Sequence, residues 1–185
     1  MTISPVSSIR RRVVRPLLAL IAAAWMLSTV SCGRSGGPSA GDATAGSLEP
    51  MPEFNLVSLG GESFGKADFA GKVVLFDFWA TWCGPCHLQA DILKEMYPGA
   101  AKRGIEFVAV STGEDAATVR DFVVRRPFPY AVLVDPEEVL GGPLEILALP
   151  TLVVMDAQGR IAYRHTGVAD AESIDAALRA AATGG

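Results

Sequence analysis

The sequence has few cysteines, no internal repeat, and none of the large excess of glycine and proline that marks disordered or collagen-like chains. Three cysteines among 185 residues are too few for a scaffold held together by disulfides, and a domain of this size can be stable without them. Twelve prolines and 19 glycines are too few, and too scattered, for a disordered or collagen-like chain. Half of the residues are apolar, which suits one domain with a core of ordinary size.

Basic charge is scarce beyond residue 31. Four of the 16 lysines and arginines lie in the first 31 residues (Arg10, Arg11, Arg12 and Arg15), and no acidic residue accompanies them. The other 12 basic residues stand against 20 acidic ones, a net charge of −8. So acidic a body offers no surface for phosphate backbones, and we expect no nucleic-acid partner.

The N-terminus has the pattern of a secretory signal. Residues 1–15 are polar and basic, residues 17–27 (LLALIAAAWML) are apolar, and small residues lead to Cys32. Cysteine directly after a small residue resembles the bacterial lipoprotein signal, in which that cysteine is lipidated and becomes the first residue of the mature protein. We therefore predict a signal peptide over residues 1–31, a lipid on Cys32 and a flexible Gly/Ser/Ala-rich tether up to residue 49.

Two other interpretations of this segment stay open. Residues 16–33 are uncharged over 18 positions, close to the lower limit for a membrane-spanning helix. The leader could thus remain as an anchor, or the protein could simply be secreted. The lipoprotein and the anchor both predict a tethered domain in the cell envelope, on the periplasmic side of a membrane.

Apolar periodicity over residues 50–185 predicts alternating strands and helices. We expect a hairpin over residues 54–64, strands at 73–78, 105–110, 130–134, 151–155 and 161–165, and helices at 83–97, 116–125, 136–147 and 170–182. Pro98 and Gly99 should end the first helix, and the glycines at 141–142 should interrupt the third. Such alternation is typical of an α/β layered sheet.

The tetrapeptide Cys83-Gly84-Pro85-Cys86 lies where a buried strand ends and a helix begins. Unpaired N–H groups and a partial positive charge at a helix N-terminus favour a thiolate on the first cysteine. Pro85 suits the first turn, where its missing N–H would have no partner. Cys86 lies on the same face and can reach Cys83, as reversible disulfide exchange requires.

Two alternatives to redox chemistry are less favoured. A structural disulfide here would close a loop of only four residues and constrain little of the unfolded chain. A zinc site needs about four ligands, and beyond these cysteines the candidates are His87 and His165. We therefore expect a redox pair, with no metal and no cofactor.

Residues 78–86 (FWATWCGPC) resemble the active-site signature of the thioredoxin superfamily. The hairpin before them, Gly71-Lys72 and residues 105–135 resemble its membrane-associated TlpA/ResA-like branch. The resemblance implies a thioredoxin fold: a central mixed sheet flanked by helices, with an N-terminal hairpin and a central insertion. It also implies thiol–disulfide exchange outside the cytoplasm. Members commonly take electrons from a membrane carrier and reduce disulfides, some of them in apocytochrome c.

The resemblance assigns roles to individual residues. Cys83 matches the nucleophile that attacks a partner disulfide, and Cys86 matches the resolving thiol. Trp82 matches an exposed aromatic residue beside the nucleophile, whereas Trp79 is expected in the core. The resemblance implies that the substrate docks on Trp82, Gly84 and Pro85 and on a cis-proline loop, Leu149-Pro150-Thr151.

Asp77 stands in an apolar strand, a poor place for a carboxylate without a function. Burial disfavours the charged form and raises the pKa of such a group. In thioredoxins the matching Asp assists proton transfer at the resolving thiol, so we expect Asp77 to act as a general base toward Cys86. Residues 108–110 offer it no Lys partner. The alternative is an Asp satisfied by backbone or water hydrogen bonds.

Several positions depart from the branch. It usually has Asn where Asp77 stands, and Glu and Pro where Gln89 and Asp91 stand. These differences favour a general reductase over a specialised reductant for cytochrome c maturation, which remains an alternative. His87 is expected to be a solvated helix residue and His165 to be structural.

The same residues bear on two further functions. Ala80 stands where related thiol peroxidases have Thr, so a peroxidase is disfavoured. A non-enzymatic thioredoxin-like binding module stays an alternative, although it would not need both cysteines. We therefore predict a monomeric protein-disulfide oxidoreductase that acts on disulfide-containing proteins and is re-reduced by a membrane electron donor.

Overall fold

A computed structural model describes residues 49–184, so the predicted signal peptide, Cys32 and most of the tether lie outside the described residues. The elements in chain order are β1 (Asn55–Ser58), β2 (Ser63–Gly65), the 3-10 helix η1 (Lys66–Phe69), β3 (Val74–Trp79), α1 (Gly84–Ala101), β4 (Glu106–Thr112), α2 (Ala116–Arg125), β5 (Ala131–Asp135), β6 (Thr151–Met155), β7 (Ile161–Thr166) and α3 (Ala171–Thr183). Within residues 49–184, no helix combines the length and the apolar character needed to cross a membrane.

The seven strands form one mixed sheet in the order β2-β1-β5-β4-β3-β6-β7. Strands β3, β4 and β5 are parallel. Strand β6 pairs antiparallel with β3, and β7 pairs antiparallel with β6 at the edge of the sheet. The β1–β2 hairpin joins the other edge by pairing antiparallel with β5. All six residues of β3 are buried, which explains why this strand is nearly continuous in apolar residues. The predicted α/β class with an N-terminal hairpin is confirmed.

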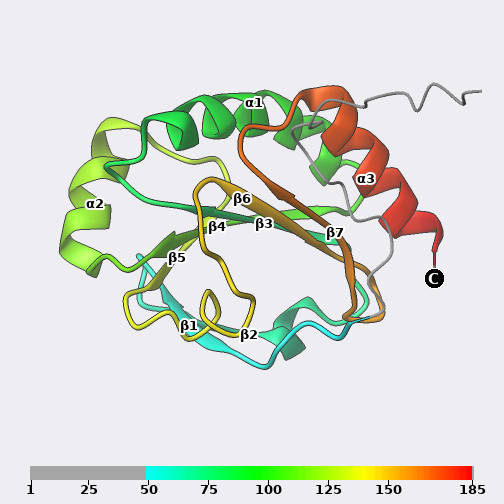
Figure 1. The fold of residues 1–185 in the computed structure, drawn as a ribbon, viewed down its shortest axis with the longest axis horizontal. Helices are drawn as coiled ribbons and strands as arrows, with labels where there is room; N and C mark the ends of the chain where they lie inside the picture. Colours follow the sequence, from blue (N-terminus) through cyan, green and yellow to red (C-terminus); the bar gives the residue numbers. More distant parts are fainter. Residues whose placement is uncertain (1–48, 185) are drawn as a thin grey trace, which may run out of the picture. The chain divides into compact units, whose positions relative to one another are not determined.

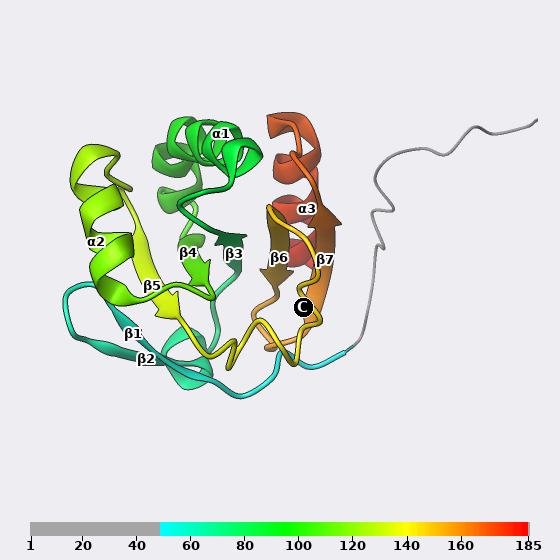
Figure 2. The same ribbon diagram turned by 60° about the vertical axis from the view of Figure 1, so that its left-hand side comes forward.

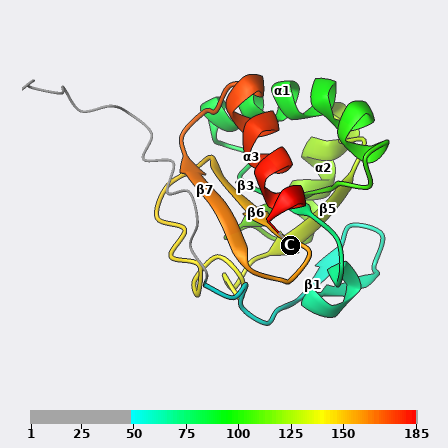
Figure 3. The same cartoon turned by 90° about the vertical axis from the view of Figure 1, so that its right-hand side faces the viewer.

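The sheet has two differently covered faces (Figure 1, Figure 3). Helices α1, α2 and α3 lie on one face, which we call the helical face. The hairpin, η1 and residues 136–147 lie against the other, the hairpin face, and Figure 2 shows residues 136–147 (yellow) on the side away from α1. Alternate residues of β3 supply the two cores: Leu75 and Trp79 pack under the helices, and Phe76 and Phe78 pack under the hairpin.

Helix starts follow the expected capping chemistry. Asp115 accepts hydrogen bonds from the N–H groups of Ala117 and Thr118 at the start of α2, and Asp170 accepts one from Ser173 at the start of α3. Each carboxylate satisfies backbone donors that the first helical turn leaves unpaired. The predicted bounds of α2 and β6 are confirmed as stated.

The predicted end of the first helix is wrong. Helix α1 continues through Pro98 and Gly99 to Ala101. Proline inside a helix removes one backbone hydrogen bond. The last turn nevertheless buries Ala100 in the core beneath the helices, and the Ala100 carbonyl accepts the N–H of Ile105 on the way into β4. Tertiary packing therefore offsets the local cost of Pro98.

The predicted short helix at residues 136–147 is also wrong. These residues form successive turns, with Glu138 and Glu145 at positive φ values of 54° and 52°. The Asp135 carboxylate accepts the N–H groups of Val139, Leu140 and Gly141 at 2.6–3.0 Å. This arrangement folds the segment back onto the sheet, where Leu140 and Leu144 are buried in the hairpin-face core.

Candidate active site

The cysteine pair lies at the end of β3, where α1 begins. Cys83 is the N-cap residue of α1, and its sulfur accepts a hydrogen bond from the N–H of Cys86 at 3.3 Å. The two cysteines form a disulfide, with their Cα atoms 5.3 Å apart. Both residues are buried, Cys83 with 4% and Cys86 with 1% of its surface exposed.

This geometry favours a thiolate on the first cysteine. A capping sulfur that accepts a backbone N–H at a helix N-terminus is stabilised in its charged form by that donor and by the helix dipole. Gly84 and Pro85, both exposed, form the first helical positions between the two cysteines. Because Pro85 has no N–H, its place in the first turn leaves no donor unpaired.

The Leu149-Pro150-Thr151 segment lies at the end of the sheet that carries the cysteine pair. The Leu149–Pro150 peptide bond is cis, as the resemblance to thioredoxins implies. Thr151 opens β6 and pairs with Phe78 near the end of β3, which brings the loop to the end of the sheet that carries the cysteines. The Pro150 carbonyl accepts the N–H of Gly167, directly after β7, at 2.8 Å. This hydrogen bond ties the loop to the end of β7.

Large apolar side chains are exposed around this end of the sheet. Trp82, directly before Cys83, is 74% exposed, and Leu147, just before the cis-proline loop, is 93% exposed. Trp79 is 1% exposed and belongs to the core, as predicted. Trp82 therefore offers exposed apolar surface directly beside the first cysteine, where another molecule can bind.

Asp77 is fully buried in β3 on the helical face, between Ala109 of β4 and Leu152 of β6. Among residues 49–184, no donor bonds to either of its carboxylate oxygens. Desolvation by burial raises the pKa of Asp77 from 3.8 to about 7. An acid that titrates near neutrality can accept and release protons at physiological pH. Of the alternative, an Asp satisfied by backbone or water hydrogen bonds, no backbone donor within residues 49–184 supplies the first kind of bond.

The phenol hydroxyl of Tyr130 lies within electrostatic reach of the Asp77 carboxyl. Tyr130, at the start of the segment leading into β5, is 7% exposed, and its hydroxyl has no hydrogen-bond partner in the described part of the chain. Desolvation first, and then the negative charge of Asp77, raises the pKa of Tyr130. This phenol therefore stays neutral at physiological pH.

Gln89 is fully buried, unlike an ordinary helix glutamine. Its side-chain oxygen accepts the N–H of Ala169 at 2.7 Å, which ties α1 to the segment between β7 and α3. Its amide nitrogen is buried and finds no acceptor among the described residues. The position at which the branch usually has Glu thus carries a neutral group one helical turn from Cys86.

His87 differs from its predicted role as a solvated helix residue. It is half-buried, its ring packs against Phe122 with centroids 5.1 Å apart, and its Nε2 donates to the Thr81 carbonyl at 3.0 Å. The α2 residue Phe122 supplies the tertiary contact that the helical pattern around His87 does not reveal. His165 lies in β7 and stacks on Tyr163.

The sequence pattern gives Glu114 no role, but the structure places it at the active-site loop. Its carboxylate accepts hydrogen bonds from the N–H and the hydroxyl of Thr81 and from the Ser111 hydroxyl. The signal that could have found it is topological. Strands β3 and β4 are parallel neighbours, so an acidic residue just after β4 arrives at the same sheet edge as the residues just after β3.

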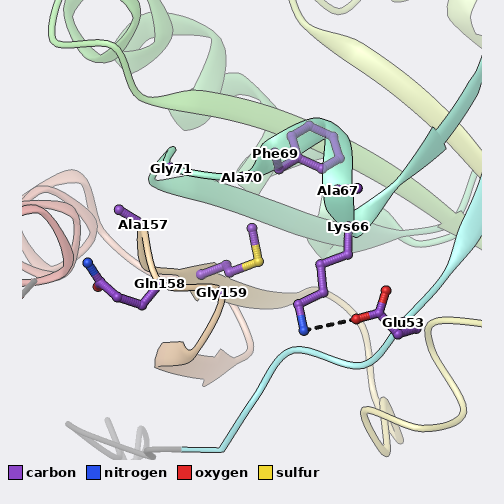
Figure 4. Close-up of a pocket in the computed structure, with 10 residues that line it drawn as sticks. Glu53, Lys66, Ala67, Phe69, Ala70, Gly71, Ala157, Gln158 and Gly159 are labelled. Atoms are coloured by element: carbon purple, nitrogen blue, oxygen red, sulfur yellow. Dashed lines mark ion pairs between the residues drawn. The ribbon is translucent and has the colours of Figure 1, made fainter.

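A hollow of about 240 Å³ lies at the opposite end of the sheet (Figure 4). Met155, in its wall, pairs with Val74 at the start of β3, whereas the cysteines follow the end of β3. Lys66 and Glu53 form an ion pair of 3.2 Å at its side. The hollow is therefore separate from the redox pair. No group of three or more His, Cys, Asp or Glu side chains that could hold a metal ion occurs within residues 49–184.

Known proteins resemble this chain along most of its length. The Redoxin family matches residues 46–178. The thiol-disulfide oxidoreductase ResA of Geobacillus kaustophilus is 32% identical over 124 residues, which cover 67% of this chain and 71% of that protein.

Solved structures agree with the sequence comparison. A thiol:disulfide interchange protein of the thioredoxin family from Chlorobium tepidum is 26% identical with a TM-score of 0.64, covering 74% of this chain and 97% of the other. An exposed lipoprotein thioredoxin of Streptococcus pneumoniae is 25% identical with a TM-score of 0.63, covering 69% and 98%. The fold and the cysteine spacing found here are therefore those of thiol–disulfide exchange proteins.

Proposed function

The chain belongs to the Redoxin family and is a dithiol oxidoreductase, and we propose that it works mainly as a disulfide reductase outside the cytoplasm. The observation that carries this proposal is Cys83 as the N-cap of α1, with its sulfur hydrogen-bonded to the Cys86 N–H. Cys83 is thereby activated as a thiolate, and Cys86 is close enough to form a disulfide with it.

The reaction proceeds in two exchange steps. The Cys83 thiolate attacks one sulfur of a substrate disulfide, forms a mixed disulfide and releases the other substrate sulfur as a thiolate. Cys86 then loses its proton and attacks the Cys83 sulfur, which frees the second substrate sulfur and leaves the Cys83–Cys86 disulfide. The substrate gains two electrons and this protein loses two. A membrane electron donor must return them before the next cycle.

Asp77 is proposed as the base for the second step. It lies on the helical face of the sheet, the face in whose core Cys86 is packed. A carboxyl with a pKa of about 7 is partly ionised at neutral pH, so it can take the Cys86 proton as that thiol becomes a nucleophile. The raised pKa of Asp77 therefore comes from its burial and not from a charged partner.

The substrate chain is proposed to dock across the cysteine motif and the cis-proline loop. Trp82, Gly84 and Pro85 present exposed surface on one side of the disulfide, and Leu149, Pro150 and Thr151 form the other side. Exposed Trp82 and Leu147 offer apolar contact to residues around a substrate cysteine. This surface suits a partly unfolded polypeptide, in which apolar residues next to cysteine are accessible.

The Gly-Pro pair between the cysteines favours reduction over oxidation. The same pair occurs in reducing thioredoxins, which have potentials of about −270 mV against about −120 mV for the oxidant DsbA. A reductase for general protein disulfides also fits Gln89 and Asp91, which replace the Glu and Pro of the branch. We expect the equilibrium with glutathione to place this protein near the reducing end of that range.

Reduction of insulin by the full chain with dithiothreitol tests the activity. We expect turnover by the native protein and none by Cys83→Ser. Cys86→Ser should accumulate mixed disulfides with partners because the second exchange cannot occur, and this variant identifies the substrates in the native cell. A protein that leaves insulin intact would contradict the reductase. Faster iodoacetamide labelling of Cys86 than of Cys83 in the reduced protein would reverse the two roles.

The location is a separate part of the proposal. The basic start, the apolar run and Cys32 support export and tethering by a lipid, and one structural relative is an exposed lipoprotein. Fractionation should find the native protein in membranes, and Cys32→Ser should release or mislocalise it. Retention of that variant in membranes would favour an uncleaved helical anchor, and native protein in the cytosol would contradict export.

A further inference from the structure

Thr81, two residues before Cys83, has every polar group engaged. Its N–H donates to the Glu114 carboxylate at 2.7 Å, and its hydroxyl donates to the other oxygen of the same carboxylate. Its carbonyl accepts the Nε2–H of His87 at 3.0 Å. A residue bonded through all three groups has little freedom, so the turn that presents Cys83 is fixed from both the β4 side and the α1 side.

Glu114 is itself held in place. The oxygen that accepts the Thr81 N–H also accepts the Ser111 hydroxyl at 3.1 Å, and the residue is half-buried between the end of β4 and the start of α2. Charge-assisted hydrogen bonds to a carboxylate are stronger than those between neutral groups. A fixed negative charge therefore stands beside the active-site turn.

The distance to the nucleophile is short enough for an electrostatic effect. Two residues of extended chain span at most about 7 Å, and the carboxylate is one hydrogen bond from Thr81. Glu114 thus lies on the order of 10 Å from Cys83, comparable with the Debye length at ordinary ionic strength. A negative charge at that distance disfavours a second one, the thiolate.

We propose that Glu114 is a positioning residue that fixes the turn before Cys83 through Thr81 and restrains the ionisation of the Cys83 thiol. The proposal rests on the assignment of Cys83 as the nucleophile. It adds to the helix N-terminus, which favours the thiolate, an opposing charge from a different element. The balance between the two sets how much thiolate is present and how reducing the pair is.

Other ionisable groups act on the same turn. His87 bonds Thr81 from α1, and Asp77 lies beneath the helix in β3. Both side chains are kept when Glu114 alone is substituted. A change confined to Glu114 therefore reports the effect of its own charge and contacts.

The test is the pH dependence of iodoacetamide labelling of Cys83 in the reduced full chain, followed on the Cys83 peptide by mass spectrometry. Glu114→Gln removes the charge, yet its amide can still bond Thr81 and Ser111. We expect the pKa of Cys83 to fall by a few tenths of a unit to about one unit, and the reduction potential against glutathione to become less negative. Glu114→Ala should lower the pKa similarly and also slow insulin reduction several-fold, because the turn is released.

Glu106→Gln is the matched control. Glu106 begins the same strand, β4, pairs with Lys72 at 3.3 Å and is in register with Val74 at the far end of β3, so its charge is screened from Cys83. Equal pKa values for Cys83 in Glu114→Gln, Glu106→Gln and native protein would overturn the proposal. A native far-UV circular dichroism spectrum shows that a Glu114 variant is folded, and the result from either folded variant decides the proposal. Because labelling measures the thiol directly, this result is distinct from a failure of the native protein to reduce insulin.

Discussion

The two faces of β3 differ in what they bury. Phe76 and Phe78 point into the hairpin-face core, where Phe76 packs against Phe54 and Phe69 with ring centroids 5.9 and 5.7 Å apart. Asp77, the residue between them, points the other way, toward the helices. Neighbouring residues of one strand thus enter an apolar core and a core that contains a carboxyl group.

The two faces differ in whether their buried polar groups are paired: the buried Asp135 carboxylate at the hairpin face accepts three backbone N–H groups, whereas most of those at the helical face lack a partner among residues 49–184. Buried polar atoms without a partner among residues 49–184 belong on the helical face to Asp77, Trp79, Gln89 and Tyr130, and on the other side to Thr112 at the end of β4. An unsatisfied buried polar atom costs free energy. The face that also holds the cysteines is therefore less optimised for stability, as is typical near functional sites.

The largest effect on stability is expected from Phe76→Ala. Phe76 is fully buried, and truncation leaves a cavity among aromatic rings, so the free energy of unfolding should fall by about 3–5 kcal/mol. The folded fraction should keep its pH–rate profile because the cysteines lie across the sheet. Urea unfolding and insulin reduction below the transition measure both. A changed pH profile in this variant would show that the two faces are not independent.

Asp77→Asn should act in the opposite sense. The pKa of Asp77 is raised from 3.8 to about 7 in the folded state, so the folded protein holds a proton that the unfolded chain has lost between pH 4 and 7. Asp77 therefore lowers the free energy of unfolding of the native protein progressively as pH rises from 4 to 7. Above pH 7 the free energy of unfolding stays lower by that full amount. Asn cannot ionise, so the variant should be more stable by about 2–4 kcal/mol at pH 8 and nearly unchanged at pH 4.

Activity separates this substitution from a purely structural one. Without the base, Asp77→Asn should slow turnover at neutral pH and alter the pH–rate profile, whereas Phe76→Ala should not. Unfolding by urea at pH 4 and pH 8, paired with insulin reduction from pH 6 to 9, gives both readouts. An unchanged profile in Asp77→Asn would leave this carboxyl without a part in the reaction.

The smallest effect is expected from Tyr130→Phe. The Tyr130 ring packs edge-on against Phe107 at 5.7 Å and Phe128 at 5.6 Å, and Phe retains these contacts. The substitution removes only the buried hydroxyl, which has no partner in the described part of the chain, so the free energy of unfolding should rise by about 1 kcal/mol. Thermal unfolding measures this change. Destabilisation instead would mean that the hydroxyl is satisfied, which would weaken the contrast between the two faces.

Local pattern was sufficient wherever a short stretch of chain contains the whole physical cause. Neighbouring residues alone are enough to predict three features. These are the apolar run of β3, the capping residue before α2, and the cysteine motif between a strand and a helix. For the same reason burial of Asp77 is predictable, because its neighbours along the strand are apolar. The resemblance to thioredoxins added the cis bond before Pro150, which no local pattern indicates.

Other features required residues that are distant in sequence. Pro98 remains inside α1 because Ala100 packs on the core, and residues 136–147 turn instead of forming a helix because Asp135 binds their backbone and Leu140 is drawn into the hairpin-face core. His87 is half-buried because α2 supplies Phe122. In each case a contact with residues distant in sequence overrides the conformation or exposure that the local sequence favours.

The sequence by itself therefore determined the α/β class, the redox pair and the strand that carries a buried acid, since hydrophobic periodicity and the motif are contained in contiguous residues. Only the tertiary structure decided that Asp77 has no partner among residues 49–184, that Gln89 is tied to Ala169, and that Glu114 bonds Thr81 across 33 positions of chain. Hydrogen bonds act over a few ångströms and charges over about 10 Å. Which groups come that close depends on how parallel strands bring their ends to one edge of the sheet.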